Sequence, residues 1–202
     1  YYRRNRDAKK NKETIFEQQK KALEHINSEC RRLERLSGKM MTLIGLYDED
    51  RIHKEPYPVD RLVREVADLE CYHMQDSQME LLAFSESWEC EMDVDLMEIL
   101  LVNLLDNAIK ASKPGSVIEL HGEKGCIWVR DFGKGIPKEE IPRITEAFYM
   151  VDKSRSRKAG GIGMGLALCQ KIAEIHRANL VIESVVGQGT KISVVFQEET
   201  DE

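Results

Sequence analysis

Residues 100–110 have the sequence LLVNLLDNAIK, an almost wholly apolar run that contains two asparagines, an aspartate and a lysine. On an α-helix Asn103, Asn107 and Lys110 share one face, because residues three and four positions apart stack. Apolar residues cover nearly all of the remaining circumference, which predicts a buried helix. They are Val94, Leu96, Met97, Ile99, Leu100, Leu101, Leu104, Leu105 and Ile109. An unpaired buried amide costs about 1–3 kcal/mol, so the asparagines indicate either a polar cleft in the core or a pair of internally satisfied amides.

The whole chain limits the class of protein. Its 202 residues suffice for one compact domain with an appendage or for two small domains. The net charge of −6 is modest and gives no reason to expect nucleic-acid binding. Five cysteines without a Cys-x-x-Cys pair, and only five histidines, argue against a disulfide framework and a zinc site and favour a reducing compartment. We expect neither a membrane span nor a signal peptide within the chain.

Residues 1–12 begin with two tyrosines and continue with clustered arginines and lysines. Aromatic residues followed by cations are typical of the region just inside the cytoplasmic end of a membrane helix. The alternative is a solvated start of a helix. We therefore expect a juxtamembrane-like segment, a soluble chain, and a parent protein held at the cytoplasmic face of the cell membrane by a segment upstream of this chain.

Residues 13–50 are expected to form a long helix with a dimerisation seam. From Ile26 onward the apolar or small residues recur in alternating steps of four and three, with charged outer faces. The seam comprises Ile15, Ala22, Ile26, Cys30, Leu33, Ser37, Met40, Ile44 and Tyr47. A helix with such a seam needs a partner helix or a second copy of the chain. Pro56 and Pro58 break the pattern, so residues 51–72 are expected to be a linker with a short helix from about Val59.

Residues 73–202 mix strands and helices without strict alternation. Strands are expected near residues 79–84, 88–92, 116–121, 126–130, 180–186 and 191–197. Helices are expected over the opening run, over residues 163–176 and, as a short piece, over 137–143, with a mobile loop over 144–162. This order predicts an α+β fold: a two-layer sandwich of a mixed, mostly antiparallel sheet with helices on one face, preceded by the long heptad-patterned helix.

Three glycine clusters follow the asparagine helix, at residues 131–135, 160–166 and 187–190. In the first, the Asp131 carboxylate can accept a hydrogen bond from an exocyclic amine and the glycines let the backbone approach a flat ligand, although Asp-Gly pairs are commonly just turns. The second opens a helix, where free N–H groups suit a phosphate. It is not a dinucleotide fingerprint, because no strand precedes it and Leu166 takes the last glycine place, nor is it a P-loop. The third alone is an ordinary hairpin turn.

Taken in order, these pieces resemble the ATP-binding domain of sensor histidine kinases, within the ATPase superfamily shared with DNA gyrase and the Hsp-ninety chaperones. Residues 103–110 are similar to the N box of that family and 131–135 to its first glycine box. Residues 146–157 resemble its F box and basic lid, and 161–166 and 187–190 its second and third glycine boxes. The resemblance covers about residues 78–197, and residues 22–47 resemble the second helix of the dimerisation and phosphotransfer hairpin.

The resemblance implies binding of Mg²⁺ and ATP. Asn103 and Asn107 would offer amide oxygens to Mg²⁺, a hard cation, and Lys110 would complete the catalytic set by reaching a phosphate. The alternative role of Lys110 is an ion pair with Asp106. Asp131 would bind the adenine amine. Further ATP contacts are implied for Gly133, Gly135, Ile136, Tyr149, Lys153, Arg157, Gly161, Gly163, Gly165, Leu166 and Thr190. Tyr149 is equally a candidate for packing of the lid, and Thr190 for support of the floor of the site.

The chain differs from the family in that it lacks the motif of the histidine that accepts the phosphoryl group. The family phosphorylates a histidine in a motif resembling His-Glu-Leu-x-Thr-Pro, and none of the five histidines here lies in one; they are His25, His53, His73, His121 and His176. No phospho-acceptor histidine is therefore expected in this chain. Lesser departures are Thr145 and Ala147 in the F box and Arg177 with Ala178 in place of paired glycines.

The leading hypothesis is the cytoplasmic part of a sensor histidine kinase in a two-component system, a transferase that dimerises through its heptad helix. It would transfer the γ-phosphoryl of ATP to a histidine, for passage to the receiver domain of a response regulator. One alternative is a degenerate kinase that binds ATP and acts as a dimerising scaffold. The other is a serine kinase or ATPase of the same superfamily, such as an anti-sigma factor.

Overall fold

The computed structural model of the chain describes residues 19–20, 22–23, 26–27, 29–31, 33–34, 36–48, 52–151 and 163–197. The chain divides into two compact units, residues 1–40 and 41–202. In the first unit the described residues are helical, and the seam residues Ile26 and Leu33 leave 58% and 62% of their surface exposed. The predicted juxtamembrane segment 1–12, Ile15 and His25 lie outside the described residues.

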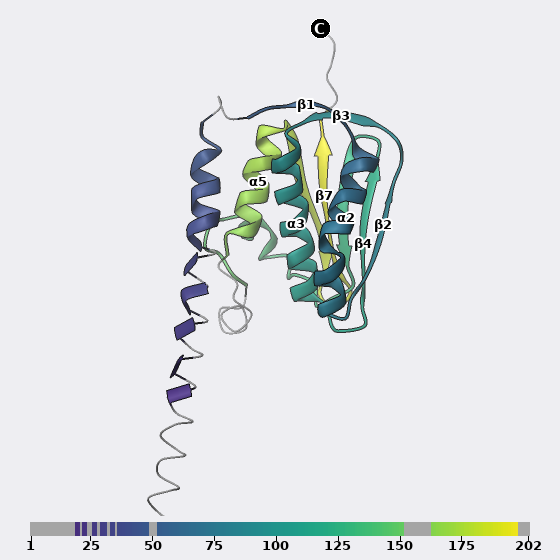
Figure 1. Cartoon of the computed structure of the whole chain (residues 1–202). Coiled ribbons are helices and arrows are strands. Elements are labelled where there is room, and N and C mark those ends of the chain that lie inside the picture. The colour runs from purple at the N-terminus through teal and green to yellow at the C-terminus, as the bar shows by residue number, and fades with distance from the viewer. Residues whose placement is uncertain are drawn as a thin grey trace, which may run out of the picture. The chain divides into compact units, whose positions relative to one another are not determined.

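The second unit is built on a five-stranded sheet with the order β2-β4-β5-β7-β6 (Figure 1). Its strands are β2 (Glu80–Ser85), β4 (Val117–Glu123), β5 (Cys126–Asp131), β6 (Ala178–Val185) and β7 (Gly189–Phe196). β2 runs parallel to β4, and the other neighbours are antiparallel. Residues alternate along β4 and β5 between a buried face and a more exposed face, as expected of a sheet covered on one side.

Three helices cover one face of this sheet (Figure 1). They are α2 (Val59–Asp76), α3 (Val94–Ala111) and α5 (Gly165–Ile175), and α3 packs against both of the others. Their apolar faces and the sheet enclose one core. The predicted α+β sandwich, with a mixed, mostly antiparallel sheet and helices on one face, is confirmed. Within the described ranges, the helices are all too short or too polar to traverse a lipid bilayer.

α3 is the buried helix that the opening run predicts. It begins after Asp93, whose carboxylate accepts a hydrogen bond from the backbone N–H of Leu96 at 3.1 Å and so caps the first turn. His176, just after α5, also fixes the start of α3, because its Nε2 accepts a hydrogen bond from the backbone N–H of Asp93 at 2.9 Å. At the other end, the carbonyl of Ala111 accepts a hydrogen bond from the backbone N–H of Lys134 at 3.2 Å. α3 thus ends against the first glycine cluster.

Residues 51–72 differ from the expected linker. Pro56 and Pro58 lie in β1 (Glu55–Pro58), which pairs antiparallel with β3 (Glu89–Met92) in a separate two-stranded sheet. Prolines are tolerated there because β1 has one neighbouring strand, so the missing N–H groups can face away from it. α2 continues to Asp76, and its residues Val59, Leu62, Val63, Val66 and Met74 are buried in the common core. This segment therefore builds part of the second unit.

Two short segments also differ from the sequence-based expectation. The helix expected over residues 137–143 is reduced to the 3-10 turn η2 (Ile141–Arg143), since Pro142 has no N–H to continue a helical ladder. β4 extends through Gly122 to Glu123, so the β4–β5 turn is shorter than expected. Gly122 is closely surrounded in the strand, because a Cβ there would lie 2.3 Å from Oγ and 3.0 Å from Cβ of Ser85.

Candidate functional site

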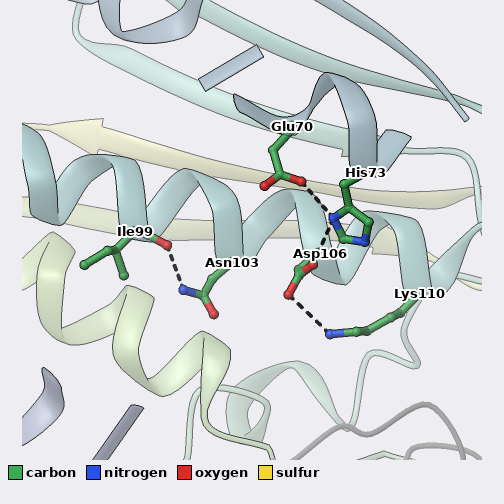
Figure 2. Close-up of polar contacts among 6 residues, drawn as sticks. All are labelled: Glu70, His73, Ile99, Asn103, Asp106 and Lys110. Carbon is green, nitrogen blue, oxygen red and sulfur yellow. Dashed lines mark hydrogen bonds and ion pairs between the residues drawn. The ribbon is translucent and has the colours of Figure 1, made fainter. Parts of the chain in front are cut away.

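The polar face of α3 carries the first group of site residues (Figure 2). Asn103 is buried, and its Nδ2 donates a hydrogen bond to the carbonyl of Ile99, one turn earlier, at 2.7 Å. Asn107 lies one turn further on. Its Nδ2 is buried and has no hydrogen-bond partner among the described residues. Of the two asparagines that the sequence singles out, Asn107 is the one that carries an unsatisfied donor, which suits an incoming ligand.

Asp131 ends β5 and is buried, with 5% of its surface exposed. Its Oδ1 accepts a hydrogen bond from the backbone N–H of Gly133 at 2.8 Å. Burial raises the pKa of this carboxyl, while hydrogen bonds from the backbone of Gly133 and Thr190 and the charge of Lys134 oppose the rise. A buried carboxylate needs donors to offset its desolvation, and a ligand amine would supply another one.

Close backbone contacts explain why glycines surround Asp131. A Cβ on Gly133 would lie 2.3 Å from the carbonyl oxygen of Ala111, and one on Gly189 would lie 2.0 Å from that of Asp131. Gly135 has a φ of +67°, and a Cβ there would lie 2.1 Å from the carbonyl oxygen of Val185. The first and third glycine clusters therefore pack backbone to backbone, and side chains at these positions would force them apart.

A serine that the sequence analysis missed joins these loops. Ser184, on β6, accepts a hydrogen bond from the backbone N–H of Ile136 at 2.8 Å and donates one to the carbonyl of Gly189 at 3.0 Å. Its Oγ lies 2.9 Å from Oγ1 of Thr190, which is buried. Thr190 and Ile136, both predicted ATP contacts, are thus held by one hydroxyl. A lone serine in an alternating strand has no distinguishing pattern, so only its neighbours in the fold could identify it.

The F-box residues lie against the start of α5. The backbone N–H of Phe148 donates to the carbonyl of Gly163 at 2.7 Å, and Gly163 has a φ of +74°. A Cβ on Gly163 would lie 2.6 Å from the carbonyl oxygen of Tyr149. The Tyr149 hydroxyl donates to the Glu140 carboxylate, which raises the pKa of the tyrosine. The structure therefore joins Tyr149 and Gly163, which the sequence places in separate boxes.

The remaining predicted ATP contacts divide by position. Gly165 opens α5, and Leu166 is partly buried against the core. Lys153, Arg157 and Gly161 lie outside the described residues. So do Arg155 and the rest of the expected basic lid.

Lys110 contacts a network of charged side chains (Figure 2). Its Nζ lies 3.5 Å from Oδ2 of Asp106, one turn earlier on α3, which is the alternative ion pair considered from the sequence. Oδ1 of Asp106 lies 3.7 Å from Nδ1 of His73 on α2, and the same Nδ1 lies 2.9 Å from Oε2 of Glu70. Sequence spacing shows the pair on α3 but gives no indication that α2 contributes the side chains of His73 and Glu70 to this network.

The donor set suits Mg²⁺ held together with a phosphate ligand. Over the described part of the chain, no three His, Cys, Asp or Glu side chains group closely enough to hold a metal ion. The oxygen donors on the polar face of α3 are instead the amides of Asn103 and Asn107 and the carboxylate of Asp106, which is paired with Lys110. Neutral amides bring no charge to a dication, so they fit a cation whose charge is balanced by its ligand.

Comparisons with known proteins show the family of this chain. Residues 92–200 match the family described as histidine kinase-, DNA gyrase B-, and HSP90-like ATPase. The sensor histidine kinase YkoH of Bacillus subtilis (strain 168) is 32% identical over 181 residues, which cover 88% of this chain and 39% of YkoH. The sensor protein kinase WalK of Staphylococcus saprophyticus is 30% identical over 175 residues, covering 83% of this chain and 29% of WalK.

Solved structures share the fold. The catalytic domain of histidine kinase ThkA has a TM-score of 0.62 and 22% sequence identity, over 73% of this chain and 97% of that domain. At this identity the likeness concerns the arrangement of helices and strands. The functional assignment depends on the family match and on the site residues described above.

Proposed function

We propose a function from the premise that this chain belongs to the histidine kinase-, DNA gyrase B-, and HSP90-like ATPase family and corresponds to the ATP-binding catalytic domain of sensor histidine kinases. It spans 39% of the length of YkoH and 29% of that of WalK. The proposed function is binding of Mg²⁺ and ATP and transfer of the γ-phosphoryl group to a histidine. The observation that carries it is the buried Asp131 carboxylate at the end of β5, enclosed by glycine loops.

Adenine recognition is assigned to Asp131. Gly133 already occupies its Oδ1, and the carboxylate retains further acceptor capacity for an exocyclic amine. Gly133 and Gly135 would let the backbone approach the ring of the base, and Ser184 bonds to both Ile136 and Thr190 next to these loops. Burial excludes water from this hydrogen bond, which favours an amine donor over competing solvent.

The phosphates are assigned to α3 and the start of α5. Asn103 and Asn107 would hold Mg²⁺ through their amide oxygens, and Lys110 would contact a phosphate. Gly161, Gly163 and Gly165 would offer backbone N–H groups at the beginning of a helix, with charge added by Lys153 and Arg157. When bound, ATP supplies the phosphoryl group and Mg²⁺ neutralises part of its negative charge. The unpartnered Nδ2 of Asn107 is a hydrogen-bond donor, so it supports an acceptor such as a phosphate oxygen beside this amide.

The acceptor histidine is assigned to another segment or another chain. His176 is buried and bonds to Ile172 and Asp93, and His73 bonds to Glu70, so both have structural partners. The proposed partners are the receiver domain of a response regulator and a second copy of the chain, which would cover the exposed seam residues Ile26 and Leu33. The proposed location is the cytoplasmic face of the cell membrane, reached through an upstream segment; residues 1–12 are proposed as the segment next to the membrane.

Incubation with γ-labelled ATP and Mg²⁺ tests this proposal. We expect no acid-labile label on the chain alone, and label on an added, intact hairpin that carries the His-Glu-Leu-x-Thr-Pro motif. Binding of ATP without transfer to any hairpin would favour the dimerising scaffold. Transfer to a serine would favour the serine kinase of the same superfamily. Failure to bind ATP would contradict the proposal as a whole.

A further inference from the structure

The ion pair of Lys110 has a consequence for phosphate binding. In the structure Lys110 Nζ lies 3.5 Å from Oδ2 of Asp106, and 43% of the lysine side chain is exposed. To contact a phosphate strongly, the ammonium must turn from the carboxylate towards the ligand. Asp106 would then lose its nearest described cation. It precedes Asn107 directly, so an unpaired negative charge there would repel the phosphates.

A second group on α2 faces the other oxygen of this carboxylate. His73 Nδ1 lies 3.7 Å from Oδ1 of Asp106 (Figure 2). The same nitrogen lies 2.9 Å from Oε2 of Glu70, whose side chain is 9% exposed. The nearly buried Glu70 therefore fixes the imidazole in place, and the imidazole presents its polar edge to Asp106 on the neighbouring helix. The charged groups in this contact are Glu70 on the helix of His73, and Asp106 and Lys110 on α3.

We propose that His73 is a positioning residue for nucleotide binding, and this role depends on the proposed function. By holding the Asp106 carboxylate from the α2 side, His73 would allow Lys110 to leave the ion pair and contact a phosphate. His73 itself touches no ligand. The effect should therefore require both the phosphates and Asp106, and it should be absent for the nucleoside part of the ligand.

Binding of ATP and of adenosine to the whole chain, each with Mg²⁺, tests this role by calorimetry. We expect His73→Gln to weaken ATP binding by about two- to fivefold, the range of a partly exposed charged contact, and to leave adenosine binding unchanged. His73→Lys, which places an ammonium group beside Asp106, should restore ATP binding. In the Asp106→Asn background His73→Gln should have no effect. His121→Gln is the matched control, because His121 stacks on Trp128 on the sheet face opposite α3.

Four outcomes would overturn the proposal. If His73→Gln weakened ATP and adenosine equally, the role of His73 would be structural. If its effect persisted in the Asp106→Asn background, it would not act through Asp106. If the unsubstituted chain bound neither ligand, both the proposed function and this role would fail, whereas ATP binding that is insensitive to His73 would overturn this role alone.

Discussion

The backbone N–H of Gly133 donates a hydrogen bond to Oδ1 of Asp131 at 2.8 Å, two residues earlier at the end of β5. Gly133 is also the residue at which a Cβ would collide with the end of α3, at the carbonyl oxygen of Ala111. The same loop thus partners the carboxylate and packs against the helix of Asn107 and Lys110. This joins the proposed adenine and phosphate sites through the backbone.

Asp131→Asn should abolish detectable ATP binding without lowering thermal stability. The substitution replaces an acceptor-only group by an amide and removes a buried charge whose desolvation opposes folding. Calorimetric titration with ATP and a thermal melt of the free chain measure the two effects. Asp68→Asn, on the exposed face of α2, is the control and should alter neither. Unchanged ATP affinity in Asp131→Asn would contradict the assignment of adenine recognition to Asp131.

Asn107→Ala and Asn103→Ala both remove a proposed Mg²⁺ ligand, but they should differ in their effect on stability. Asn107→Ala removes an unpartnered donor, so the free chain should keep its stability while binding of Mg²⁺ and ATP is lost. Asn103→Ala removes the hydrogen bond to Ile99 and should lower the free energy of unfolding by about 1 kcal/mol. Urea unfolding and ATP titration of both variants check this. Strong destabilisation by Asn107→Ala would support a structural core amide instead.

Gly189→Ala should destabilise the chain more than Gly187→Ala in the same turn. Gly189 has a φ of +109°, and a Cβ would lie 2.0 Å from the carbonyl oxygen of Asp131. Gly187 has a φ of +79° and nothing within 4 Å of the added Cβ. Backbone strain costs about 1–3 kcal/mol at either position, and overpacking adds about 1–3 kcal/mol at Gly189 alone. Urea unfolding measures the difference, and equal losses would show that the close contact relaxes freely.

Stability should decline below pH 6.5 because of His176. Its Nδ1–H donates to the carbonyl of Ile172 at 2.7 Å, and its Nε2 accepts from the backbone N–H of Asp93 at 2.9 Å. Burial lowers the pKa of this neutral ring from its ordinary value of 6.5. Between that value and the lowered one, the unfolded chain binds more protons than the folded chain, so the free energy of unfolding falls as the pH falls. Above 6.5 the contribution is complete.

Urea unfolding between pH 8 and pH 5 checks the His176 prediction. The decline should be smaller in His176→Gln and unchanged in His121→Gln, whose ring stacks on Trp128. Equal slopes in all three proteins would mean that another group dominates the pH dependence.

The buried helix, the strands of the main sheet and the α+β class could be predicted from the sequence. Local periodicity carries that information, because apolar spacing reports which face of a helix or strand meets the core. β1 could not be predicted in this way. Pro56 and Pro58 argue against a strand unless its single neighbour, β3, is known.

Some residues of the candidate site could likewise be predicted from the sequence and others could not. Asn103, Asn107, Asp131 and the glycines stand out in the sequence, because their chemistry and order match a known arrangement. Ser184 and His73 do not stand out, since their roles depend on neighbours 48 and 33 positions away, Ile136 and Asp106.

The sequence by itself determined the buried polar helix, the three glycine clusters and the lack of an acceptor motif, because these are properties of residues close together in the chain. Only the tertiary structure decided that β2 and β4 run parallel, that Ser184 supports Thr190, and that Asn103 rather than Asn107 has a hydrogen-bond partner on its amide nitrogen. Such pairings depend on distances between segments that only the packed core brings together. The periodicity of residues along the chain does not predict them.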